Sequence, residues 1–210
     1  MKQGDIYKLH KKYSHGKYKK EILEIVWTHS LIVKDISLQI VNHLEEKYGI
    51  KTDKKIVEFG ALIHDIGFYD CFDDNYKKTC KYLLHGKMGY DILTKEGVSQ
   101  KKARFALTHT GVGISNEQIE KENLDLPKNN YVPISLEEEI VCYADNFHSK
   151  GHPRFNDFEG TLEELNKINP NYGVILKRYR EKFGIPDLKQ LKEKYREWHR
   201  DINEWVEGLK

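Results

Sequence analysis

Long apolar runs are absent from this chain of 210 residues, and no stretch approaches the roughly 18 apolar residues that a membrane-spanning helix needs. The basic N-terminal stretch also lacks the apolar run that would follow it in a secretory signal. The chain also has little net charge, because its 35 Lys and Arg residues are nearly balanced by 33 Asp and Glu residues. This balance gives no argument for a nucleic-acid polymer or a membrane as a partner.

Cysteine is scarce, and its spacing excludes the usual cysteine chemistries. The three cysteines, Cys71, Cys80 and Cys142, are an odd number and contain no CxxC pair. Neither a disulfide framework nor a thiolate zinc site is therefore expected. A reduced, cytoplasmic setting fits this composition best.

Strand-like alternation, internal repeats and low-complexity tracts are also missing, and helical periodicity dominates instead. Apolar positions recur at three- and four-residue steps from Glu21 to Lys47, and Gly49 predicts the end of that helix. A polar loop is expected over residues 68–79, and its acidic residues, Asp74 among them, could gate a site or have no function. Further helices are predicted over residues 52–67, 85–95 and 99–109, after caps at Ser115 and Ser135, after a capping box at Thr161–Glu164, and from about Asp187. The sequence thus predicts an all-α fold.

Three segments are expected: a basic N-terminal segment over residues 1–20, a main helical domain over 21–155, and a C-terminal helical extension over 156–210 packed on the same domain. The basic segment is interpreted as a solvated helix face or a frayed terminus rather than a polyanion site. The last helix carries an apolar heptad stripe that includes Trp198 and Trp205. We expect this stripe to be buried across the body of the domain, and a homodimer seam is the alternative.

The dipeptide His64-Asp65 closes an apolar run over residues 59–63. An imidazole and a carboxylate at the end of a buried segment are costly unless something pairs with them. Further side chains of these types fall on the apolar faces of other predicted helices: His29, His85, His109 and Asp145. Polar side chains that point inward from several helices are what a metal site in a helical core requires.

Taken singly, each of these residues has an ordinary explanation. A lone inward histidine is more often a satisfied core residue than a ligand, and an inward aspartate is usually a helix cap or an ion-pair partner. These explanations would have to hold for the whole set at once, with no obvious inward Arg or Lys to neutralise the acids. A metal centre accounts for all of them, and mixed imidazole and carboxylate ligation suits iron, manganese, zinc or cobalt better than calcium.

The order of these residues resembles the H…HD…D signature of the HD-domain metal-dependent phosphohydrolase superfamily. Residues 61–67 look like its HDIG variant, and residues 140–146 resemble its last-ligand helix. Residues 84–93 and 108–111 are similar to two histidine blocks of the subset that has additional metal ligands. The resemblance covers about residues 21–150 and is closest to uncharacterised HDIG proteins of archaea and bacteria.

The resemblance implies an HD-domain helical bundle that binds one or two divalent metal ions, chosen among iron, manganese, zinc, cobalt and nickel. By residue-wise carry-over, the first metal would be bound by His29, His64, Asp65 and Asp145. The second would be bound by His85 and His109, with Asp65 bridging. Phe68 stands where HD-GYP proteins carry a lysine after HDIG, and no GYP motif follows, which argues against cleavage of cyclic-di-GMP.

The expected function is a phosphohydrolase that uses a metal-activated hydroxide on a phosphomonoester or phosphodiester of a small molecule, with a nucleotide favoured. Asp65 is expected to be catalytic, together with a basic group. Lys87 and Lys150 are the candidates for that group, and Arg154 is a further available cation. The histidines that follow Asp145, His148 and His152, could contact substrate or donate a proton, or have no such role.

Two other functions stay open. Some HD proteins with a ligand set of four histidines and two aspartates are di-iron oxygenases, and the ligand set alone does not separate them from hydrolases. The third hypothesis is a non-catalytic nucleotide-binding HD protein that binds partner proteins through its heptad stripe.

Overall fold

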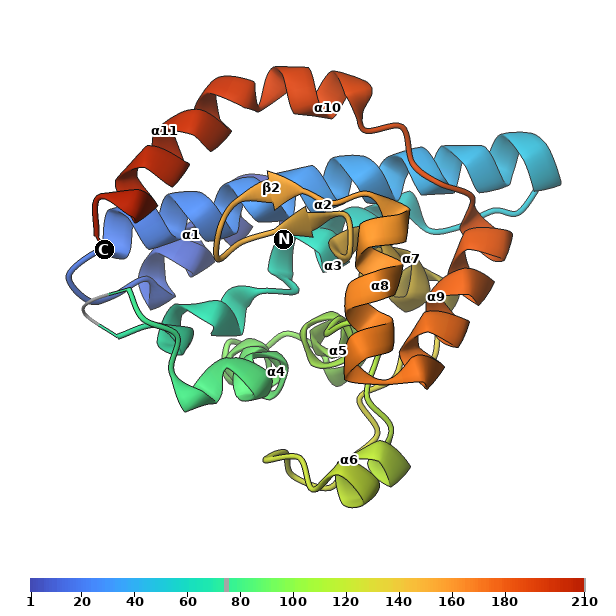
Figure 1. Cartoon of the computed structure of the whole chain (residues 1–210), viewed down its shortest axis with the longest axis horizontal. Coiled ribbons are helices and arrows are strands. Elements are labelled where there is room, and N and C mark those ends of the chain that lie inside the picture. Colours follow the sequence, from blue (N-terminus) through green and yellow to red (C-terminus); the bar gives the residue numbers. More distant parts are fainter. Residues whose placement is uncertain (74–75, 210) are drawn as a thin grey trace.

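The computed structural model describes residues 1–73 and 76–209, except for the side chains of residues 80 and 81. Its spine is the long helix α2 (Lys19–Tyr48), which runs across the molecule in Figure 1 and buries a continuous row of aliphatic side chains. Gly49 ends this helix with a φ of 66°, a conformation that glycine adopts without a steric penalty. The predicted end of the helix is therefore confirmed.

Helix α3 (Lys54–Ile63) packs on α2 and begins at a predicted cap. The Asp53 side chain accepts hydrogen bonds from the backbone N–H groups of Lys55 and Ile56, at 3.0 and 3.1 Å. The prediction that this helix reaches Gly67 is wrong, because the helix stops at Ile63 and a 3-10 helix, η1 (Ile66–Cys71), follows.

The reason for this change lies in a tertiary contact at Gly67. A Cβ atom on Gly67 would lie 2.1 Å from the carbonyl oxygen of His85 and 2.4 Å from the backbone nitrogen of Gly89. Without a side chain, η1 can lie directly against helix α4 (His85–Lys95). The predicted loop at 68–79 is therefore partly helical and buried at its start, and Asp74 of that loop lies outside the described residues.

Helices α4, α5 (Gln100–Thr108) and α7 (Leu136–Asp145) close the core beside α2 and α3. The bounds of α4 and α5 lie within a residue of the predicted ranges, and α7 begins after the predicted cap Ser135. A second 3-10 helix, η2 (Cys80–Leu84), leads into α4. Between α5 and α7 the chain forms a small lobe around α6 (Asn116–Glu122), which lies at the lower edge of Figure 1. The capping box of Ser115 and Gln118 forms at the start of α6 as predicted.

A short antiparallel hairpin of β1 (His148–Ser149) and β2 (Arg154–Phe155) follows α7 and is the only sheet within the described residues. Helices α8 (Phe158–Ile168) and α9 (Pro170–Phe183) then pack against each other. No helix in the described ranges combines the length and apolar character needed to cross a membrane.

The predicted capping box at Thr161–Glu164 is wrong. The N-cap of α8 is Asp157, whose side chain accepts a hydrogen bond from the Gly160 backbone N–H at 2.7 Å. Aspartate is the stronger N-cap residue, and it stands one turn earlier. Thr161 therefore lies inside the helix, where its hydroxyl donates to the Asp157 carbonyl at 2.9 Å.

The C-terminal segment contains two helices rather than the single one predicted, α10 (Lys189–Lys194) and α11 (Arg196–Glu207), with Tyr195 between them. Both arch over α2 in Figure 1. Trp198 Nε1 donates to Glu24 Oε1 on α2 at 3.0 Å, and both Trp198 and Trp205 are half-buried. The apolar stripe thus packs on the body of the same chain, although its two tryptophans are only partly buried rather than fully buried as expected.

The basic N-terminal segment folds into α1 (Gln3–Tyr13), which packs on α2, α3 and η1. Its inner face buries Ile6, Leu9 and His10, whereas Lys8 and Lys11 are exposed. Of the two interpretations of this segment, the structure therefore favours the solvated helix face over the frayed terminus.

Candidate metal centre

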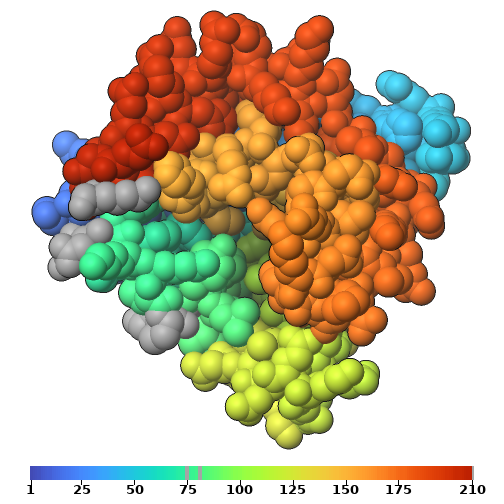
Figure 2. Space-filling model, in the orientation of Figure 1, coloured from blue at the N-terminus to red at the C-terminus, as the bar shows by residue number. Residues whose placement is uncertain are grey.

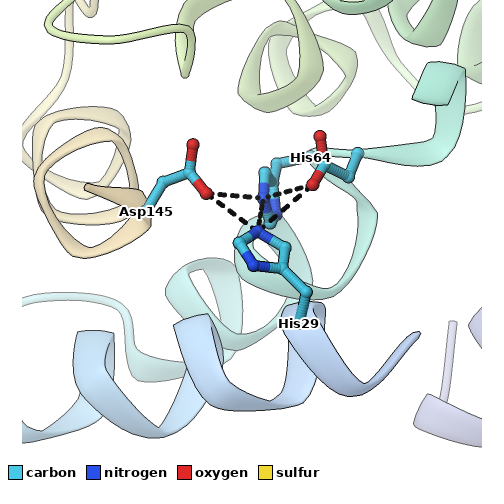
Figure 3. Close-up of side chains that lie close together, drawn as sticks. His29, His64 and Asp145 are labelled. Carbon is cyan, nitrogen blue, oxygen red and sulfur yellow. Dashed lines mark hydrogen bonds and ion pairs between the residues drawn. The ribbon is translucent and has the colours of Figure 1, made fainter. Parts of the chain in front are cut away.

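The first group of metal-binding candidates consists of His29, His64, Asp65 and Asp145, and it lies where α2, the turn after α3 and the end of α7 meet (Figure 3). His29 Nε2 lies 2.8 Å from Asp145 Oδ1, 3.2 Å from Asp65 Oδ2 and 3.1 Å from His64 Nε2. The four donor atoms lie within 4.8 Å of one another, so the group could hold one metal ion.

A second group shares Asp65 with the first and adds His85, which begins α4, and His109, which follows α5. Asp65 Oδ1 lies 3.5 Å from His85 Nε2 and 3.2 Å from His109 Nε2. All three side chains are buried. Asp65 therefore directs one oxygen at each group, Oδ2 at the first and Oδ1 at the second.

Backbone carbonyls fix the rings of three of these histidines. The Nδ1 atoms of His64, His85 and His109 each lie against the carbonyl oxygen three residues earlier in the chain, those of Ala61, Tyr82 and Ala106. Because a carbonyl oxygen can only accept, each Nδ1 carries a proton. In the neutral ring, the Nε2 lone pair then points toward Asp65.

In this arrangement, histidine nitrogen lone pairs and carboxylate oxygens converge, and too few hydrogen-bond donors face them. Neutral His85 and His109 would direct two nitrogen lone pairs at each other over 2.8 Å, and burial, followed by the nearby His109, lowers the pKa of His85 to about 3. Within the described residues, both Asp65 oxygens and Asp145 Oδ1 are buried, and the groups around them are histidine rings and a single ammonium, that of Lys150. Converging buried acceptors need a cation, so the donor set fits divalent metal ions of the imidazole- and carboxylate-binding kind.

One ammonium group lies inside this cluster, so the expectation that no Arg or Lys points inward is wrong. Lys150 Nζ is 2.6 Å from Asp65 Oδ2 and 3.4 Å from His29 Nε2, and the side chain is buried. Burial alone would lower the pKa of Lys150, but the carboxylates of Asp145 and Asp65 outweigh it and raise the pKa above its ordinary value. Lys150 therefore remains charged beside the first group.

The carboxylates and His64 also shift one another's pKa values. Burial would raise the pKa of Asp65 and Asp145, but the Lys150 ammonium and His64 hold both well below their usual range. Burial would lower the pKa of His64, yet the carboxylates raise it to about 9. Metal-free His64 thus carries a proton in neutral solution, which a metal ion at Nε2 would displace.

His29 is held in another way, through residues far along the chain. Its Nδ1 lies 2.8 Å from Nδ1 of His148 on β1, and His148 Nε2 lies 3.0 Å from His199 Nε2 on α11. His199 Nδ1 in turn lies 2.8 Å from the carbonyl oxygen of Tyr195. His199 is not among the residues predicted from sequence, which offers only its place one turn after Tyr195 as a signal.

A cavity of about 1110 Å³ opens beside the first group, between the β-hairpin, α8, α11 and the segment around Tyr76. Asp145 and Lys150 form part of its wall. Aromatic rings and cations line much of the rest: Phe72, Tyr76, Tyr82, Lys77, Lys78 and Arg154. In Figure 2 a hollow is visible between the green segment and the gold and orange segments.

The other predicted residues lie away from the donor groups. Lys87 Nζ pairs with Asp91 at 2.6 Å on the outer face of α4, and no ion pair within the described ranges joins it to the cluster. His152 and Arg154 line the cavity. His152 Nδ1 lies 2.8 Å from Asn203 Oδ1 on α11.

Known proteins similar to this chain agree with its motifs. A family model described as the HD domain matches residues 26–150. An uncharacterised protein of Methanocaldococcus jannaschii is 36% identical over 123 residues, which are 59% of this chain and 66% of that protein. The tRNA (cytidine(56)-2'-O)-methyltransferase of Picrophilus torridus is 35% identical over 118 residues, 52% of this chain and 31% of that protein. The chain thus spans just under two thirds of the first relative and under one third of the second.

Solved structures show a similar fold. The HD domain of the phosphodiesterase PgpH of L. monocytogenes superposes with a TM-score of 0.51 at 17% identity, over 84% of this chain and 97% of that domain. The same domain in complex with cyclic-di-AMP gives a TM-score of 0.50 at 18% identity, over 84% of this chain and 95% of that domain. At this identity the likeness concerns the fold, and it confirms the predicted all-α architecture.

Proposed function

The chain belongs to the HD-domain family, as its motifs predict, and from this premise we propose that it is a metal-dependent phosphohydrolase. It cleaves a phosphomonoester or phosphodiester of a small molecule, with a nucleotide as the favoured substrate. The observation that carries the proposal is that one buried carboxylate, Asp65, joins two groups of metal-binding side chains beside a cavity lined by cations.

In this proposal the two groups bind two divalent cations, of iron, manganese, zinc, cobalt or nickel. The first is held by His29, His64, Asp65 and Asp145, and the second by Asp65, His85 and His109. Bound cations supply an activated water and offset the charge that spreads over phosphate oxygens in the transition state. The Asp65 carboxylate orients both groups, because its two oxygens point at different histidines.

Lys150 is the cation that the chain itself contributes to the reaction. Its ammonium lies at the boundary between the donor groups and the cavity, in contact with Asp65. A charged donor in a water-poor site stabilises a phosphate oxygen more strongly than a solvated one does. Because Lys87 is paired with Asp91 outside this cluster, we assign the role to Lys150.

The cavity favours an anionic substrate with a flat, stackable group. Lys77, Lys78 and Arg154 provide positive charge around it, and the charge of Arg154 is partly offset by Glu164, which lies 3.6 Å away in the same wall. The rings of Phe72 and Tyr76 stack at 4.5 Å in its wall, and a nucleobase can stack on such aromatic surfaces. The similar PgpH domain in complex with cyclic-di-AMP supports the nucleotide class.

We also propose that residues 21–155 carry the site and that residues 156–210 complete it. The donor residues and Lys150 lie in the first of these segments, whereas the second adds Val206 of α11 and Leu209, which follows α11, to the cavity wall. Residues 1–20 support η1 from the outside through α1.

The test is a screen of nucleotides and phosphodiesters with added Mn²⁺, on protein purified without chelator. We expect hydrolysis by the natural protein and by Asp70→Asn, whose exposed carboxylate pairs with His15 outside the cluster. Asp65→Asn should show no hydrolysis. Metal-loaded protein that hydrolyses nothing in the screen would contradict the proposal.

Measurements on the same purified protein distinguish two alternative functions. Iron as the main metal, with an air-dependent colour change and consumption of O₂, would indicate a di-iron oxygenase. Nucleotide binding without turnover would indicate a non-catalytic nucleotide-binding protein. Because this chain matches under a third of the length of the methyltransferase relative, that protein's named activity is not proposed for this chain.

A further inference from the structure

With neutral rings, the hydrogen bonds that link His29 to α11 admit a single placement of protons. The Tyr195 carbonyl oxygen can only accept, so His199 Nδ1 carries the proton and, in a neutral ring, His199 Nε2 accepts. His148 Nε2 must then donate to His199, which leaves His148 Nδ1 as an acceptor. His29 Nδ1 donates to that atom, and the His29 Nε2 lone pair faces Asp65 and Asp145.

The surroundings of these three histidines leave little room for another placement of the protons. His29 is fully buried, His148 is 3% exposed, and burial favours the neutral form of both rings. His148 also lines the cavity, but both of its ring nitrogens are already occupied, Nδ1 by His29 and Nε2 by His199. The Phe155 ring packs against both outer histidines, with its centroid 5.3 Å from that of His148 and 5.1 Å from that of His199.

We infer that His148 and His199 are positioning residues that hold His29 with Nε2 directed at the first metal, so that helix α11 sets the metal affinity of the first group. Outer hydrogen bonds of this kind fix the tautomer and ring orientation of metal-binding histidines. In the second group, the contacts described for Nδ1 of His85 and His109 are instead with carbonyls within one helical turn. The inference rests on the metal-binding part of the proposed function and not on its reaction.

The first test is competition between the full-length protein and a chromophoric chelator for Co²⁺. Removal of an outer partner typically weakens metal binding by about 10- to 100-fold. We expect His148→Leu to weaken one of two Co²⁺-binding steps by roughly that factor, and His199→Leu to weaken the same step by about tenfold. The other step should keep its natural affinity.

Two further variants separate positioning from general packing. In His199→Gln, the side-chain oxygen can still accept the His148 Nε2 proton, so Co²⁺ affinity should stay within about threefold of the natural protein. Asn203→Ala removes other contacts between α11 and the hairpin, with His152 and the Pro153 carbonyl, and leaves the histidine chain intact. Its Co²⁺ affinity should be unchanged.

The second test needs no substitution. Long-range ¹H–¹⁵N NMR of histidine-labelled protein should show His199 protonated at Nδ1, His148 at Nε2 and His29 at Nδ1. A His148 ring protonated at Nδ1 would overturn the inference.

The remaining outcomes are equally decisive. Natural affinity in His199→Leu, equal weakening of both Co²⁺ steps, or a His199→Gln variant as weak as His199→Leu would each contradict the positioning role. If the natural protein binds no Co²⁺, the metal-binding proposal fails and this inference fails with it. If it binds two Co²⁺ ions and His199→Leu binds them as tightly, only this inference fails.

Discussion

His85 and His109 are anchored within their own helical turns, whereas His29 is anchored through His148 and His199 to the C-terminal part of the chain. Short-range hydrogen bonds therefore fix the histidines of the second donor group and also His64 of the first, whereas His29 of the first group depends on how α11 docks. Asp65 is the only acid that both groups share among the described residues. The comparison shows that some side chains of the candidate site are fixed by neighbours in the sequence, whereas His29 is fixed by contacts between distant segments.

The largest effect should come from removing what the two groups have in common. Asp65→Asn removes the only carboxylate of the second group and one of the two carboxylates of the first, so we expect the metal content to fall from two ions per chain to none. Elemental analysis of protein purified without chelator measures this. Asp70→Asn is the matched control and should keep both ions, because Asp70 pairs with His15 at the surface. Two retained ions in Asp65→Asn would remove Asp65 from the site.

Breaking only the second group should halve the metal content. His85→Ala removes one imidazole from a group that has three donors and leaves the first group's four donors in place. We expect one ion per chain by elemental analysis and an unchanged helical circular dichroism spectrum. A count of two ions in a folded variant would show that His85 is not a ligand.

Lys150 contacts Asp65 of the first group, and its replacement should lower the free energy of unfolding most when no metal is bound. Lys150→Met leaves the buried Asp65 carboxylate without its 2.6 Å partner, and breaking a buried ion pair typically costs about 3 kcal/mol or more. Urea denaturation of metal-stripped protein should show this decrease in the free energy of unfolding. Lys167→Met, which removes an exposed pair with Glu163, should change it little. Equal stability of the two variants would contradict the placement of Lys150.

The smallest expected effect is a difference in proton release. Metal-free His64 has a pKa of about 9, so metal binding to the first group should release about one proton near neutral pH. Release should fall to zero as the pH rises through about 9. His85, with a pKa of about 3, is already neutral and should release none. Calorimetric titration with Zn²⁺ in buffers of different ionisation enthalpy measures both, and release that persists above pH 10 would contradict the assignment to His64.

Local sequence signals predicted much of the fold. Gly49 and the caps at Asp53, Ser115 and Ser135 act within one or two turns, so their effect can be read without knowing the rest of the chain. The inward placement of the six candidate ligands followed from helical spacing in the same way.

What the sequence did not reveal depends on contacts between distant segments. Helix α3 stops before Gly67 because η1 packs on the backbone of α4, and neither segment signals this by itself. The contact of His199 with His148 likewise needs α11 to lie over β1. The stripe around Trp198 predicted that this segment packs on the domain, but not which polar side chain would enter the site.

The most direct test of the account is an anomalous-scattering map of crystals loaded with Zn²⁺. The account predicts two peaks, each about 2.0–2.2 Å from one oxygen of Asp65, with His29, His64 and Asp145 around one and His85 and His109 around the other. A single peak, or two peaks that do not share Asp65, would contradict it.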